Sequence, residues 1–139
     1  MMNQLDRQVS KLIKCLNSGI FDSTVITGTN TDLKAFHKNL IRKLPSESYS
    51  VESLDLTDSE HLISNVDNRK EINLVVVLGL EHFLPMENRT FALRTILDTG
   101  KHQGLKSVIF CEANHYAQHF TDLNAPFYKF CLCMPLSTE

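Results

Sequence analysis

Several features that would place this sequence in a special structural class are absent or scarce. Only 5 Gly and 4 Pro occur among 139 residues and no segment repeats, which excludes collagen-like, linker-like and repeat architectures. The 14 Lys and Arg nearly balance the 16 Asp and Glu, so general attraction to nucleic acid or anionic lipid is excluded, but a local basic patch is not. What remains, with 42% hydrophobic residues, is the composition of one globular domain with a substantial core.

Long apolar runs are also missing. No stretch approaches the roughly 20 apolar residues that cross a bilayer, and the sequence does not open on a basic segment followed by an apolar one. We therefore expect a cytoplasmic protein without a membrane partner. The four cysteines, Cys15, Cys111, Cys131 and Cys133, lack C-x-x-C spacing and lie mostly among apolar residues, so reduced core thiols are expected.

Apolar residues recur at spacings that predict helices and strands in alternation. Gly19, Pro45 and Gly100 supply stop signals, and Thr31 with Asp32 has the composition of a helix cap. We expect helices at residues 3–18, 33–44, 57–66, 86–99 and 115–120, and strands at 23–27, 49–56, 72–79, 107–111 and 128–133.

The strand at 72–79 is the most apolar stretch, and its valines indicate a central strand covered on both faces. Alternation of this kind predicts an α/β fold, a three-layer α/β/α domain with a mostly parallel five-stranded sheet. A single domain is expected over residues 1–139, with an N-terminal amphipathic helix at 1–20 and a core at 23–135. Ligands of such sheets bind at the carboxyl ends of the strands.

The segment after the first expected strand carries half of a phosphate-binding motif. A phosphate loop, G-x-x-x-x-G-K-S/T, wraps backbone amides around phosphates, places a Lys beside them and holds magnesium through a hydroxyl. Gly28 and Lys34 match this spacing, whereas Leu33 and Ala35 replace the second glycine and the hydroxyl. The acidic residue before Leu33 adds negative charge to a cradle for anions. The segment resembles a P-loop NTPase that has lost half its motif, and a capped helix start after a tight turn explains the same residues.

Two further segments resemble the ASCE class of P-loop proteins, which includes AAA+ and RecA-like motors. Residues 74–82 resemble the hydrophobic strand and acidic pair of that class, with a carboxylate at Glu81 and the metal-coordinating Asp replaced. Residues 93–114 resemble the helix, turn and next strand, with Asn114 near the place of the polar sensor residue. The turn at 100–105 is similar to one in the DNA-pumping branch. The resemblance covers roughly residues 23–135 and implies the fold of that class.

The resemblance also implies where ATP would bind, namely at Gly28, Thr29, Asn30, Lys34, Glu81 and Asn114. Hydrolysis needs a phosphate cradle, magnesium and a positioned water together. The departures at Leu33, Ala35 and Gly79 remove part of the phosphate cradle and the side chains that would hold magnesium. Each charged hydrogen bond lost weakens the binding of phosphate and metal by about 1.5–3 kcal/mol. We therefore expect no cofactor, no catalytic residue and no enzyme activity, with residual ATP binding through Lys34 left open.

The expected function is that of a regulatory or adaptor protein acting by protein–protein interaction. Its partner would be an ATPase or another subunit of a DNA-handling, phage-defence or secretion machine, and self-association is open. One alternative is an ATPase subunit whose site a neighbouring subunit completes. Another is a DNA-binding module with a basic face.

Other reactive side chains have simpler interpretations. His115 and His119, four residues apart behind Cys111, are candidate zinc ligands, but the motif Glu and a second ligand cluster are missing, so no metal is expected. An acid–base pair of Glu81 and His82 lacks the serine or cysteine elbow of a hydrolase.

Basic residues gather in two clusters. The simplest interpretation of such clusters is a solvent-exposed face without a partner. If both faced one side, they would form a stripe for DNA backbone or an acidic partner. The first helix is a further candidate interface, because a minimal α/β core can be complete without it. The two clusters are Lys34, Lys38, Arg42 and Lys43, and Arg89, Arg94, Lys101, His102 and Lys106.

Overall fold

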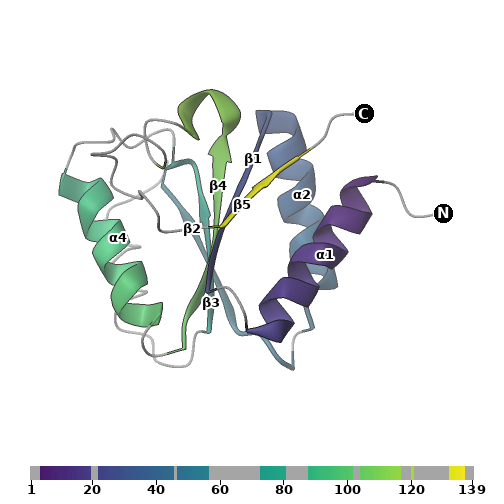
Figure 1. Ribbon diagram of the computed structural model, residues 1–139, viewed down its shortest axis with the longest axis horizontal. Helices are drawn as coiled ribbons and strands as arrows, with labels where there is room; N and C mark the ends of the chain where they lie inside the picture. Colours follow the sequence, from purple (N-terminus) through teal and green to yellow (C-terminus); the bar gives the residue numbers. More distant parts are fainter. Residues whose placement is uncertain are drawn as a thin grey trace.

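The computed structural model describes residues 4–19, 22–45, 47–56, 73–80, 88–101, 104–116, 120 and 132–136. Helices and strands alternate along these residues, except that β3 is the next described element after β2 (Figure 1). The helices are α1 (Gln4–Ser18), α2 (Asn30–Lys43), α4 (Asn88–Lys101) and the short 3-10 helix η2 (Ala113–His115). The strands are β1 (Ser23–Gly28), β2 (Val51–Asp55), β3 (Leu74–Leu78), β4 (Lys106–Glu112) and β5 (Leu132–Pro135).

The described strands form one sheet in the order β2-β3-β4-β1-β5, and every neighbouring pair is parallel. β3 is an interior strand whose residues Leu74 to Val77 are fully buried, although β4 rather than β3 holds the middle position. Between β1 and β4, the buried hydroxyl of Ser107 donates a hydrogen bond of 2.9 Å to Ser23, its partner in the register. The predicted three-layer α/β fold with a parallel five-stranded sheet is confirmed.

Side chains of each strand alternate between two hydrophobic cores, one on either face of the sheet. In β1, Val25 joins the core covered by α4, whereas the next residue, Ile26, joins the core covered by α1 and α2. Helix α4 buries Thr90, Leu93 and Leu97, and the two leucines belong to the core on its side of the sheet. Figure 1 shows α1 and α2 together on one side of the sheet and α4 on the other.

Helix α1 is part of this core rather than an addition to it. Its apolar residues Val9, Leu12 and Leu16 are at most 1% exposed and pack with Phe36 and Leu40 of α2. Full burial of each such side chain contributes about 1.5–3 kcal/mol. The apolar face of the first helix, which was named above as a candidate interface, is therefore occupied by the core of the domain.

Several element boundaries differ from those predicted, and three of the differences have a local cause. Helix α2 begins at Asn30, because Thr29 rather than Thr31 caps it. Helix α4 continues through the expected stop at Gly100 to Lys101, and the left-handed turn falls at Gly104, whose φ is +90°. Strand β5 includes Pro135, which an edge strand tolerates because one side of it needs no N–H donor.

Some predictions fall on residues that the structure does not describe. These are the short helix at 57–66, the middle of the helix expected at 115–120 and the start of the last strand at 128–131. None of the described helices combines the length and apolarity that spanning a bilayer requires.

Candidate functional site

The candidate nucleotide-binding residues lie near one edge of the sheet. Because β3, β4 and β1 are adjacent and parallel, their carboxyl ends meet at the edge where ligands of α/β sheets bind. Gly28 is the last residue of β1 and is in register with Glu112, the last residue of β4. Asn114 follows in η2. Glu81 and His82, which come after β3, lie outside the described residues.

The connection between β1 and α2 is a single residue, Thr29. Its backbone is extended, with φ −78° and ψ 159°, and its side-chain oxygen accepts a hydrogen bond of 3.2 Å from the Asp32 amide. The Leu33 amide donates to the Thr29 carbonyl at 2.9 Å, the first bond of the helical ladder. Asn30 is already helical. Of the two interpretations of this segment, a partial phosphate loop and a capped helix start, the structure therefore has the capped helix start.

Residues 33–35 lie inside α2 and face different environments. Leu33, at the place of the second motif glycine, is buried with Phe36 and Leu40 in the core below α1 and α2. Lys34 is exposed, and Ala35 is partly buried. The amide of Leu33 is used within the helix, so the backbone here is not curled around an anion.

Two residues near the start of α2 oppose the binding of a phosphate. One acts through its negative charge and the other through the space that its side chain fills. Asp32 lies in the first turn, where the helix dipole favours an anion, and its Oδ2 is buried without a hydrogen-bond partner. Leu136, which follows β5, donates its amide to the Thr27 carbonyl at 2.8 Å. Its side chain lies 3.3 Å from the place that a Cβ on Gly28 would occupy.

The polar groups after β4 are at the surface. Asn114 is exposed, and His115 Nε2 lies 3.9 Å from the Glu112 carboxylate. Cys111, the sequence neighbour of Glu112, is fully buried. His119 lies outside the described residues. Among the residues that are described, no group of three or more His, Cys, Asp or Glu could hold a metal ion.

His37 is a polar side chain near this edge that the sequence alone did not single out. Its ring packs edge-on against Phe110, with centroids 5.7 Å apart, and its Nε2 is buried without a hydrogen-bond partner. Burial lowers the pKa of His37, and the charge of Asp55 opposes this effect. The only sequence signal was its position four residues after Leu33 on the same helix, which does not distinguish a buried histidine from a surface one.

The two basic clusters do not lie on one face. Lys34, Lys38 and Arg42 are on α2, while Arg94 and Lys101 are on α4, which covers the opposite face of the sheet (Figure 1). The described residues of the two clusters therefore do not form a single stripe.

Comparison with known proteins adds information on the fold. No family model matches the sequence, and no curated protein matches it. A crystal structure described as a DNA replication initiation factor is similar over 100% of this chain, with a TM-score of 0.65 and 15% sequence identity. The chain spans 48%, about half, of the length of that protein. At this identity the likeness shows the fold alone, a parallel α/β domain.

Proposed function

We propose that this chain is a P-loop-like domain that does not hydrolyse nucleotide and acts as a regulatory or adaptor protein in a DNA-handling machine. The observation that carries the proposal is the start of α2 at Asn30, one residue after the end of β1. A phosphate loop needs four free residues and a glycine between its first glycine and its lysine. In this chain, residues 30–33 are a helical turn instead.

Two side chains in and after this turn support the same proposal. Phosphoryl transfer depends on positioning and on electrostatic stabilisation of phosphate charge by amides, lysine and magnesium. Asp32 contributes a negative charge at the place where a phosphate would need a positive field. Ala35 offers no hydroxyl for magnesium. Lys34 alone cannot replace these interactions.

The proposal is tested by thermal unfolding with and without millimolar ATP and Mg²⁺. A ligand that binds only the native state, at a hundredfold excess over its Kd, adds about 2.7 kcal/mol to the free energy of unfolding. We expect no shift in Tm. A rise in Tm that disappears in Lys34→Ala but persists in Lys38→Ala, a matched exposed lysine on the same helix, would show that the chain still binds ATP through Lys34. ATP turnover by the chain alone that Lys34→Ala abolishes would contradict the proposal.

A second candidate is an ATPase subunit whose site a neighbouring subunit completes, since Gly28 and the loop after β4 lie at the same edge. Supporting this alternative would take ATP turnover that appears only when a partner protein is added and that Lys34→Ala abolishes. Turnover unaffected by Lys34→Ala would belong to the partner.

The adaptor role predicts a protein partner, an ATPase or another subunit of a larger complex. Capture of the tagged chain from cells that make it, followed by cross-linking, is expected to identify such a subunit. Sedimentation of the chain alone distinguishes this outcome from self-association. A chain that remains alone in both measurements would contradict the adaptor role.

A further inference from the structure

Basic charge is concentrated in one layer of the molecule. Helices α1 and α2 together contain seven Lys and Arg and two acidic residues. The remaining chain therefore holds seven Lys and Arg and fourteen Asp and Glu, from totals of 14 and 16. A protein with a net charge of −2 thus carries a layer of net charge +5 on one face of its sheet.

The basic side chains of this layer point to solvent. Since the apolar stripes of both helices are buried against the sheet, the residues opposite those stripes form the outer surface. All six of the following side chains are exposed and define what we call the α1–α2 basic face: Arg7, Lys11, Lys14, Lys34, Lys38 and Arg42. On each helix they recur every three or four residues, about 5–6 Å along the axis.

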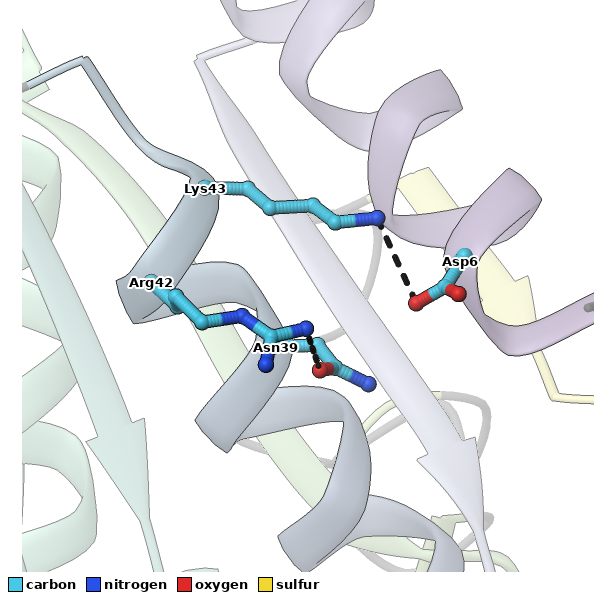
Figure 2. A network of polar contacts seen from close by, with 4 residues as sticks. All are labelled: Asp6, Asn39, Arg42 and Lys43. Atoms are coloured by element: carbon cyan, nitrogen blue, oxygen red, sulfur yellow. Dashed lines mark hydrogen bonds and ion pairs between the residues drawn. The ribbon is translucent and has the colours of Figure 1, made fainter. Parts of the chain in front are cut away.

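Acidic residues of the two helices do not neutralise this face. The Asp6 carboxylate is 3.3 Å from Lys43 Nζ, a lysine outside the basic face, in a contact that joins α1 to α2 (Figure 2). Arg42 donates a hydrogen bond of 2.8 Å to the side-chain oxygen of Asn39, which is an uncharged partner (Figure 2). Oδ2 of the other carboxylate, Asp32, is buried.

The chemistry of the face favours a duplex polyanion over other partners. Protein interfaces have an apolar centre, but among the described residues of α1 and α2 only Ile41 is a large exposed hydrophobic side chain. Insertion into lipid needs the apolar side of an amphipathic helix, and that side of α1 is buried in the core. Single strands stack on exposed aromatic rings, whereas the one phenylalanine of these helices, Phe36, is fully buried.

We propose that the α1–α2 basic face binds the phosphate backbone of double-stranded DNA without reading its sequence. The face lies on the outer surface of two helices whose apolar sides are buried in the core, so binding needs no rearrangement of that core. The proposal concerns a surface of the fold and does not depend on whether the chain binds nucleotide.

The test is fluorescence anisotropy of a labelled 30-base-pair duplex at several salt concentrations. Neutralising Z phosphates gives a slope of log Kobs against log salt of about −0.9Z, so six contacts predict a slope of about −5. The double variant Lys11→Gln/Lys38→Gln removes two contacts. We expect its slope to fall in magnitude by about 2 and its affinity at low salt to drop about tenfold or more.

The matched control is Lys101→Gln/Lys106→Gln, which removes the same charge from α4 and β4. Thermal unfolding confirms that both variants are folded. Equal loss of affinity in the two variants would show attraction to overall charge and would overturn the proposal. A slope near zero would also overturn it, as would equal or tighter binding of single-stranded DNA, polyglutamate or phosphatidylserine vesicles at the same salt.

Discussion

Thr29 determines where α2 begins, because its side-chain oxygen satisfies the amide of Asp32. We expect Thr29→Ala to lower the free energy of unfolding by about 1 kcal/mol, the usual contribution of an N-cap. Thr31→Ala is the matched control, since Thr31 is exposed within the first turn and alanine is a better helix former. Urea denaturation of both variants checks this. A larger loss in Thr31→Ala would mean that the helix starts two residues later than described.

His37 predicts a pH dependence of stability. Because burial lowers the pKa of His37 from 6.5, the unfolded chain takes up a proton that the native chain excludes. The free energy of unfolding is therefore highest above pH 6.5 and falls as the pH drops below that value. In His37→Leu this fall is expected to shrink, while stability at pH 7.5 stays equal or rises because an unpaired buried nitrogen is removed.

Denaturant titrations between pH 7.5 and 5 measure this difference. His115→Gln serves as the control, since His115 is partly exposed on η2. Parallel pH profiles for the wild type and His37→Leu would contradict the assignment, because the whole dependence would then come from other groups.

Individual side chains were the least predictable part of the candidate site. Thr29, Thr31 and Asp32 are all good capping residues, so composition alone cannot choose between their positions. The choice depends on how far β1 extends, and β1 runs to Gly28, one residue beyond the predicted end. Because β1 extends to Gly28, only Thr29 remains between the strand and α2, and the segment forms a capped turn instead of a phosphate loop. The burial of His37 depends on Phe110, a residue of β4 that lies 73 positions away.

At the scale of elements, α1 is expected to be required for stability. Leu12 is fully buried, so Leu12→Ala should lower the free energy of unfolding by about 2–5 kcal/mol through lost transfer energy and a cavity. Lys11→Ala, the exposed neighbour, should change it by less than about 0.5 kcal/mol. Chemical denaturation of the pair checks this. Similar stabilities for the two variants would show that the domain core is complete without α1.

The elements themselves were largely predictable because their apolar patterns are strong. Residues 4–18 repeat apolar side chains at helical spacing, and β3 is almost continuously apolar. Boundaries were harder to predict wherever a stop signal was weak. Both Gly100 and Gly104 are possible helix ends in the sequence. In the structure Gly104 is the residue with the left-handed backbone, and Gly100 lies within the helix.

For the whole molecule, the strand order predicts a gradient of local stability. Strands β4 and β1 have neighbours on both sides and helices on both faces, whereas β5 is a short edge strand with partly exposed residues. We expect native-state hydrogen exchange to be slowest at the amides of β4 and β1 and much faster in β5. Uniform protection across the sheet would show instead that the domain opens only as one unit.

The architecture followed from alternation of helices with doubly apolar strands, which few folds accommodate. The order of the strands did not follow, because it depends on how each crossover passes over the sheet. The same uncertainty affected charge: the sequence shows two basic clusters, but only the arrangement of layers puts α2 beside α1 and away from α4. The basic surface therefore extends over α1 and α2, two helices that the sequence alone does not place side by side.

The position of β1 also constrains how the chain is made. Both neighbours of β1 come late in synthesis, since β4 is complete only at Glu112 and β5 only at Pro135. A nascent chain shorter than this can pair β2 with β3, but it leaves β1 and the apolar sides of α1 and α2 without their sheet. Productive folding therefore waits until β4 has left the ribosome, and any product truncated before β4 exposes the surface that chaperones and proteases recognise.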